Sequence, residues 1–374
     1  MDYFGNRHDE KYVFKRVSWL NYSEHGNYDY ITDGSIELST EADLVATGSF
    51  SFEGYEIPDT NDLIRIYYRF TDEFGNTESH ALATLFTSYS ELEYIDTLRG
   101  IKAKGTLEGK SVLSVLDESM YGAPYTVKRN ENAIYKAVQI LKSKNLLVNY
   151  TPGSYVLSTD HTFDAGTTWL EIVRWLCDAA GYAAPYPDEL GIIQLQPFDD
   201  LQRAPARQIF RNDANSIMLP EIEVENPWQE TPNVYKLLYN VDTCCMIATA
   251  RNLSGSRASL DARGGREQTE FDETGELPET GNRLTNLMDK AENELKKVSA
   301  DVEYVTMKHA WLPLYLYDNI TIKYADFEWT GNVGNMTLNL EPGTMTQTKI
   351  KRELYDTLEI ERTGEYLRGD ENED

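Results

Sequence analysis

The side chains best suited to catalysis or metal binding are few in this sequence, and their spacing fits neither role. None of the histidines forms an H-x-x-x-H pair, and none lies at ligand spacing from a cysteine or another histidine. His309, close to Trp311, is better interpreted as an interfacial strand residue than as a general base. The sequence therefore predicts neither a metal site nor a cofactor. The five histidines are His8, His25, His80, His161 and His309.

A nucleophile or a phosphate-binding loop is not indicated either. The three cysteines, Cys177, Cys244 and Cys245, cannot supply a disulfide framework, and their odd number suits a reducing compartment. In a strand, the adjacent Cys244 and Cys245 would point to opposite faces. The motifs G-x-S-x-G, P-loop and G-x-G-x-x-G do not occur, and DARGGRE at 261–267 lacks the strand-to-helix context that cradles phosphate.

Pairs of carboxylates are the remaining way to do chemistry. With 62 acidic residues such pairs are inevitable, and the D-E pairs at 72–73, 117–118 and 188–189 fall in or beside predicted turns, where solvated acids are expected. A glycosidase needs two acids that face each other across a cleft, and sequence spacing does not reveal such a pair. We therefore predict a structural protein and not an enzyme, with an acidic hydrolase kept as a third interpretation.

Length and charge limit the class of protein further. At 374 residues the chain exceeds the size of one hydrophobic core, so two or more domains are expected. The formal net charge of −27 argues against sequence-specific binding of nucleic acid, because no basic surface neutralises phosphates. No run of about 18 apolar residues occurs, so no membrane-spanning segment is predicted. The charged N-terminus lacks the apolar core of a signal peptide, which predicts synthesis in a cytoplasm.

The elements that carry these side chains are mainly strands. Residues 1–107 are predicted to form an antiparallel β domain, because apolar and polar residues alternate between turns rich in Gly, Asn, Asp and Pro. One connection, FTDEFGN, is interpreted as a hairpin turn with Gly75 and Asn76 at its tip.

Helical spacing replaces alternation in residues 108–206, which are predicted to form an α/β domain. Its clearest helices are expected within 131–145 and 163–182, where apolar residues fall on one face. The second of these ends at Gly181, a residue suited to the left-handed conformation after a helix.

Strands return after residue 206. Residues 207–250 and 300–356 are predicted to form a second β domain together. An insertion at 251–299, a polar Gly-rich loop followed by a helix, interrupts it. Residues 357–374 are expected to be an acidic C-terminal tail that ends in a disordered RGDENED.

Two stretches of the chain repeat each other. DLIRIYYRFTDEFGN at 62–76 and DNITIKYADFEWTGN at 318–332 match without a gap at six of fifteen positions. Both are predicted to be hairpins, with the G-N pair as the turn in each copy. Because alternating strands draw on few residue types, chance recurrence is the alternative explanation. The matched positions are Asp62 and Asp318, Ile64 and Ile320, Ile66 and Ile322, Tyr68 and Tyr324, Gly75 and Gly331, and Asn76 and Asn332.

A second pair of stretches extends the repeat. SIEL at 35–38 resembles EIEV at 221–224, an offset of 186 residues, whereas the two hairpins are offset by 256. The second copy therefore carries 70 additional residues between those points, and the insertion at 251–299 accounts for most of them. One β domain that occurs twice, interrupted after its second strand in the later copy, explains both offsets.

Specific segments of the chain resemble a known family. They are FDAGTTWLEIVRWLCDAAGY, the following GIIQLQPF, and the closing LPLYLYDNITIKYADFEWTGNVGNMTLNLEPGTMTQTKIKRE. With these segments the chain resembles, over nearly its whole length, the baseplate or tail-tip hub proteins of tailed bacteriophages, which correspond to the N-terminal structural part of tail-associated lysins. The resemblance implies an α+β, mainly β fold. It would contain two related tube-like antiparallel β-sandwich or barrel domains, an α/β domain between them and an insertion in the second.

The resemblance also implies a role in the virion. A hub of this kind is a homotrimer at the tail tip, assembled in the host cytoplasm, whose ring adapts the sixfold tail tube to a threefold tip. Its expected neighbours are the distal tail protein or tail tube ring, the tape measure protein, and a tip spike, fibre or lysin. Double-stranded DNA would pass through its acidic channel without specific binding. The resemblance implies no catalytic residue, and it leaves degradation of the host wall to another chain.

The main alternative is a carbohydrate-binding tail or adhesin module. It is suggested by the 25 Tyr and 6 Trp residues, which suit aromatic β surfaces. This alternative predicts an exposed aromatic cluster in a groove and glycan binding by the isolated protein. A hub predicts instead a trimer with a central channel and no affinity for glycans.

Overall fold

The computed structural model is mainly β and divides the chain into two compact units. The larger unit comprises Met1–Glu223 and Thr306–Ile350, and the smaller one comprises Val224–Val305 and Lys351–Asp374. The structure describes residues 7–119, 122–157, 160–213, 216–241, 244–274, 277, 282–299, 301–354 and 358–368.

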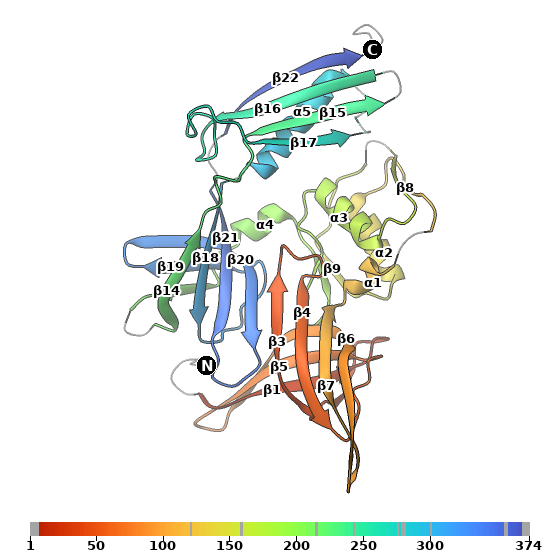
Figure 1. Cartoon of the computed structure of the whole chain (residues 1–374), viewed down its shortest axis with the longest axis vertical. Coiled ribbons are helices and arrows are strands. Elements are labelled where there is room, and N and C mark those ends of the chain that lie inside the picture. The colour runs from red at the N-terminus through yellow and green to blue at the C-terminus, as the bar shows by residue number, and fades with distance from the viewer. Residues whose placement is uncertain are drawn as a thin grey trace. The chain divides into compact units, whose positions relative to one another are not determined.

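The first part of the larger unit is a set of antiparallel strands, as the alternation of apolar residues predicts. In Figure 1, β1 and β5 cross behind β3, β4 and β7, so the sheet folds back on itself. Its core lies between these layers, where the ring of Phe14 on β1 lies 6.0 Å from that of Phe50 on β4. The strands are β1 (Arg7–Val17), β2 (Glu24–Asn27), β3 (Ile31–Ser39), β4 (Ala46–Gly54), β5 (Leu63–Asp72), β6 (Thr77–Thr97) and β7 (Gly100–Ser111).

A second set of strands comes from the later part of the chain. It has the same neighbour order as the first: β3-β4-β7-β6-β5-β1 in one set corresponds to β14-β18-β21-β20-β19-β13 in the other. A pairing that differs between the two sets is the last one, because β1 is antiparallel to β5 whereas β13 is parallel to β19. The strands of the second set are β13 (Gln208–Arg211), β14 (Met218–Glu225), β18 (Asp301–His309), β19 (Asn319–Tyr324), β20 (Phe327–Asn339) and β21 (Thr346–Leu354).

The two sets form one continuous sheet. Strand β20 pairs antiparallel with β3, with Asn335 opposite Ser39 and Asn339 opposite Ser35. This ladder satisfies backbone donors and acceptors on both strands, so neither β3 nor β20 is left as an open edge.

A helical segment connects the two sets. The capping box of α3 fixes its start, because the Thr168 hydroxyl accepts from the Glu171 backbone N–H while the Glu171 carboxylate accepts from the Thr168 N–H. Gly181 follows the helix with a φ of +73°, as its predicted role as a helix stop requires. Both predicted helices are confirmed, with shorter bounds. The elements are α1 (Ser114–Asp117), β8 (Tyr125–Val127), α2 (Ala133–Ser143), β9 (Val148–Tyr150), β10 (His161–Phe163), α3 (Trp169–Ala179), β11 (Tyr186–Pro187), β12 (Ile193–Leu195) and α4 (Phe198–Arg203).

The smaller unit is a four-stranded sheet, ordered β17-β15-β16-β22, with α5 packed on one face (Figure 1). Leu287, Ala291 and Leu295 on α5 are fully buried against that face. At Gly364 on β22 the helix comes so close that a Cβ atom would lie 2.9 Å from the Leu284 side chain. The elements are β15 (Val234–Val241), β16 (Cys244–Ser254), β17 (Thr269–Thr274), α5 (Arg283–Val298) and β22 (Glu359–Arg368).

This smaller unit differs from the predicted division of the chain. Strand β15 and most of β16 fall within 207–250, which was expected in the second β domain, but they pair in the separate sheet together with β17. Part of the expected tail at 357–374 is strand β22, paired with β16, and residues 369–374 lie outside the described part of the chain. Alternation marks a strand but not its partner, so local pattern could not separate the two sheets. No helix among the described residues is long and apolar enough to cross a membrane.

Replacing the buried Leu287 by Ala tests whether the smaller unit has its own core. Loss of the side chain is expected to cost about 2–5 kcal/mol of unfolding free energy. Hydrogen exchange should then accelerate in β15 and β16 but not in β5, because the cavity lies in the smaller unit only. Asn293→Ala, at an exposed position of α5, is the control and should change neither the unfolding free energy nor the rate of hydrogen exchange. Equal acceleration in both units would contradict the division.

Candidate functional site

The first repeated stretch forms the hairpin of β5 and β6, and its predicted turn is confirmed. Gly75 has a φ of +83°, a conformation that favours glycine. Asp72 holds the turn, because its carboxylate accepts from the Phe74 N–H at 2.9 Å and from the Asn76 N–H and side-chain amide at 2.8 Å. These bonds lower the pKa of Asp72, with the Asn76 side chain as the largest cause.

The second stretch also forms a hairpin, of β19 and β20, but its turn is not at the G-N pair. Ala325, with a φ of +51°, lies in the turn between Tyr324 and Phe327. Gly331 and Asn332 lie within β20, opposite Ile320 and Asn319. The prediction of a turn at Gly331 and Asn332 is therefore wrong. The reason is strand length: β19 has 6 residues and β5 has 10, so the chain reverses earlier in the second copy.

The repeated isoleucines form the core of both hairpins. Ile64, Ile66, Ile320 and Ile322 are fully buried, as alternate positions on the inward face of a strand require. The repeated tyrosines differ in their surroundings. The ring of Tyr68 is buried 4.3 Å from that of Trp311, which lies in the segment between β18 and β19 of the second set.

Tyr324 is half-buried, and its hydroxyl donates to the Pro220 carbonyl at 2.7 Å. Tyr324 therefore connects β19 to β14 within the second set. Tyr68, in contrast, connects the first set to the second.

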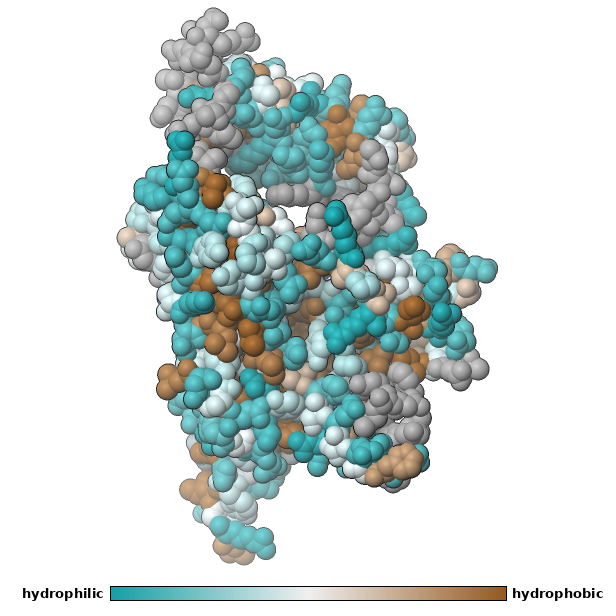
Figure 2. All heavy atoms as spheres, turned by 180° about the vertical axis from the view of Figure 1, so that it is seen from behind, coloured by the Kyte–Doolittle hydropathy of each residue, from teal (hydrophilic) through white to brown (hydrophobic). Residues whose placement is uncertain are grey.

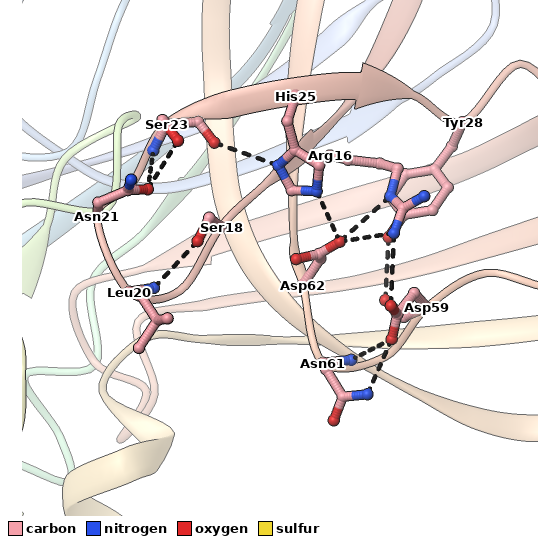
Figure 3. Close-up of polar contacts among 10 residues, drawn as sticks. All are labelled: Arg16, Ser18, Leu20, Asn21, Ser23, His25, Tyr28, Asp59, Asn61 and Asp62. Carbon is pink, nitrogen blue, oxygen red and sulfur yellow. Dashed lines mark hydrogen bonds and ion pairs between the residues drawn. The ribbon is translucent and has the colours of Figure 1, made fainter.

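Asp62, which directly precedes β5, anchors an arginine (Figure 3). Its carboxylate accepts from Arg16 at 2.8 and 3.2 Å and lies 3.0 Å from the His25 ring nitrogen. The guanidinium also lies 5.5 Å from the centre of the Tyr28 ring and 3.4 Å from Asp59. The bond to Asp62 raises the pKa of Arg16.

Asp318, which directly precedes β19, has the same kind of partners. It accepts from Arg207 at 2.9 and 3.1 Å and from the Tyr315 N–H at 2.8 Å. The Arg207 guanidinium lies 5.2 Å from the centre of the Tyr315 ring. Burial raises the pKa of Asp318 despite these partners. Each copy thus begins its hairpin with an aspartate that holds an arginine beside a tyrosine ring.

The arginine partners were not predicted from the sequence. Arg16 is 46 residues from Asp62, and Arg207 is 111 residues from Asp318. No local spacing marks a pair so far apart, and the repeated aspartates were the only signal. The contacts of Asp62 and Asp318 hold the starts of β5 and β19 against other segments of the chain.

A cavity of about 290 Å³ lies at the start of the second hairpin, within the larger unit. Asp318 and Asn319 line it together with Asp188 and Glu189, which follow β11. The prediction of solvated acids at 188–189 is wrong, because both are half-buried and burial raises the pKa of each carboxyl. Among the described residues, no group of three or more His, Cys, Asp or Glu side chains could hold a metal ion.

His309 is buried and fully engaged, as its interpretation as an interfacial residue requires. Its Nδ1–H donates to the Ala310 carbonyl at 2.7 Å, and its Nε2 accepts from the Thr348 hydroxyl at 2.8 Å. Burial lowers the pKa of His309 to about 4, so the ring is neutral and has no nitrogen left to act as a base. The buried Cys177 has its pKa raised to about 12 by desolvation and is a core residue of α3.

The two anchoring aspartates should matter to stability. Asp62→Ala and Asp318→Ala each remove charged hydrogen bonds to an arginine and should cost about 1–3 kcal/mol of unfolding free energy. Urea unfolding measures this cost. Glu73→Ala, at an exposed position in the turn between β5 and β6, should change it by less than about 0.5 kcal/mol. If Asp62→Ala and Asp318→Ala lower the unfolding free energy no more than Glu73→Ala does, the two aspartates contribute little to stability.

The neutral His309 makes the fold sensitive to acid. Its folded pKa lies below the unfolded value of about 6.5, so its contribution is fully present above that value and is lost as pH falls towards 4. The loss approaches about 3 kcal/mol below pH 4. His309→Gln should flatten the pH dependence of the unfolding free energy between pH 6.5 and 4, measured by urea titration. Parallel curves for the two proteins would contradict this assignment.

No protein-family model and no curated protein matches this chain, but solved structures do. The tail protein from Neisseria meningitidis MC58 is similar with a TM-score of 0.61 and 9% identity, over 92% of this chain and 97% of that one. The 43 kDa tail protein of prophage MuSo2 from Shewanella oneidensis has a TM-score of 0.59 and 9% identity, over 92% of this chain and 98% of that one. The prophage tail protein gp18 from Listeria monocytogenes EGD-e has a TM-score of 0.52 and 10% identity, over 91% of this chain and 94% of that one. Over nearly its whole length, this chain has the fold of prophage tail proteins.

Proposed function

We propose that this chain is a structural hub of a phage tail tip or baseplate. Three copies would form a ring that adapts the sixfold tail tube to a threefold tip and lets DNA pass. The observation that carries the proposal is the duplicated strand order, β3-β4-β7-β6-β5-β1 and β14-β18-β21-β20-β19-β13, in a chain with a tail-protein fold. The role is structural and needs no catalytic residue.

The duplication supplies the physical reason for a trimer. A ring of closed symmetry repeats the same interface around its axis. Three chains that each carry two similar strand sets present six similar β domains, of tube-like form in this proposal. Such a ring offers sixfold contacts to a tube on one side and threefold contacts on the other.

The charge of the chain suits the passage of DNA. Its formal net charge is −27, and hydrophilic residues cover most of the face that Figure 2 shows. If part of this charge lines the channel, double-stranded DNA meets repulsion and does not adhere.

The proposed neighbours follow from this position in the tail. A distal tail protein or tail tube ring would lie on the sixfold side, and a tip spike, fibre or lysin on the threefold side. The tape measure protein would end at the ring. The site of action is the tail tip of the virion, after assembly in the host cytoplasm.

A carbohydrate-binding module is the second candidate. The observation that favours it is a cluster of half-buried rings, in which His161 stacks on Trp175 at 3.9 Å and Phe163 lies 5.4 Å from the same tryptophan. Aromatic platforms of this kind suit the apolar faces of sugars. This candidate requires glycan binding by the isolated chain, and the hub does not.

Solution mass and imaging test the hub. Light scattering should give three times the chain mass of 42.7 kDa, and electron micrographs should show rings with a central opening. Each ring should contain six similar β domains, because every chain contributes two strand sets. A closed dimer, or a trimer without an opening, would contradict the proposal. Binding to a glycan array by the same sample would favour the carbohydrate-binding module.

A further inference from the structure

The cavity beside the second hairpin has an apolar side and an acidic side. Leu38 on β3 and Leu82 on β6 line it from the first set of strands. Asp188 and Glu189 line it from the turn after β11, and Asp318 from the start of β19. All of these residues belong to the larger unit, so the walls of the cavity are fixed by one compact body.

Two of the three carboxylates already have their donors. Asp188 accepts from the backbone N–H groups of Leu190 at 3.0 Å and Ile192 at 2.8 Å, and from the Gln194 side chain at 2.9 Å. Asp318 accepts from Arg207 and from the Tyr315 N–H.

Glu189 is different, because no other residue in the described part of the chain donates a hydrogen bond to its carboxylate. Burial is the largest cause and raises the pKa of Glu189. The bond from its own backbone N–H lowers this pKa, Asp188 raises it, and Arg207 lowers it more weakly than Asp188 raises it. Its environment is therefore unfavourable for a carboxylate that stays alone, and a positive group beside it would relieve the repulsion.

Arg207 is the cation in this cavity lining, and it lowers the pKa of Glu189 less than burial and Asp188 raise it. Its Nη1 donates to both oxygens of Asp318, and its guanidinium lies 5.2 Å from the centre of the Tyr315 ring. The formal charges of Asp188, Glu189, Asp318 and Arg207 leave the lining negative. The volume of about 290 Å³ suits a small guest, and the two leucines suit an apolar stem.

We propose that this cavity binds a guanidinium or ammonium group on a short apolar stem, as in an arginine or lysine side chain, with Glu189 as its counter-ion. The charged end lies at Glu189, and the stem lies against Leu38 and Leu82. The guest is either a side chain of a neighbouring protein or a free small molecule of the same chemistry. The binding does not depend on the proposed hub function.

Nα-acetyl-L-arginine amide is the probe, and Nα-acetyl-L-citrulline amide is its uncharged control of similar shape. Saturation-transfer NMR on the full chain at pH 7 should detect the arginine probe and give at least about tenfold weaker binding for citrulline, as expected when a charged hydrogen bond is lost. Glu189→Gln should weaken the arginine probe by about the same factor. Glu189→Asp keeps the charge and should keep the preference for arginine over citrulline.

Glu73→Gln, at the exposed turn between β5 and β6, is the matched control and should bind the probe as the unchanged chain does. Equal binding of the two probes, or unchanged binding by a folded Glu189→Gln, would overturn the proposal. A side-chain-resolution map of the chain in its native assembly separates the two sources of the guest. A neighbouring chain's arginine or lysine in the cavity identifies a protein source, and density for an unconnected molecule identifies a free one.

Discussion

The pairing of β20 with β3 is the constraint on which the larger unit depends. These strands lie about 300 residues apart in the sequence, yet residues 335–339 pair with residues 35–39 and make one sheet from two strand sets. Backbone bonds from the Leu340 N–H to Gly34 and from the Thr40 N–H to Gly334 extend the ladder at both ends. Unpaired backbone groups on buried strands are costly, so this ladder fixes the two sets against each other.

The other long-range contacts of the unit rely on that ladder. Tyr68 from the first set packs on Trp311, which follows β18 of the second set, and the cavity forms where both sets meet the segment after β11. Val45 and Tyr317 line this cavity with φ angles of +61° and +65°, a region that residues other than glycine rarely adopt. Such backbone strain persists only where the surrounding structure over-determines it. The cavity thus results from the way in which the two similar strand sets are joined. The repeated sequence at 62–76 and 318–332 does not by itself indicate it.

Duplication with local change explains how the chain could serve two symmetries. Both hairpins keep a buried Ile-x-Ile pair and an aspartate that holds an arginine beside a tyrosine ring. They differ in strand length, in turn position and in the direction of the strand beside them, because β1 is antiparallel to β5 and β13 is parallel to β19. Two similar but not identical surfaces are what a ring needs if it is to offer sixfold contacts on one side and threefold contacts on the other. The fold similarity to prophage tail proteins supports the same proposal.

The sequence alone determined the features that local chemistry controls. These are the alternating strands, the caps of α3, the turn at Gly75 and the burial of the repeated isoleucines. Tertiary structure decided which strands pair, where the second hairpin turns, and that β15 and β16 join β22 in a separate sheet. It also decided that the acids at 188–189 are half-buried and which arginines meet Asp62 and Asp318. The physical reason is range: periodicity and capping act within a few residues, whereas strand partners, ion pairs and burial depend on segments that only folding brings together.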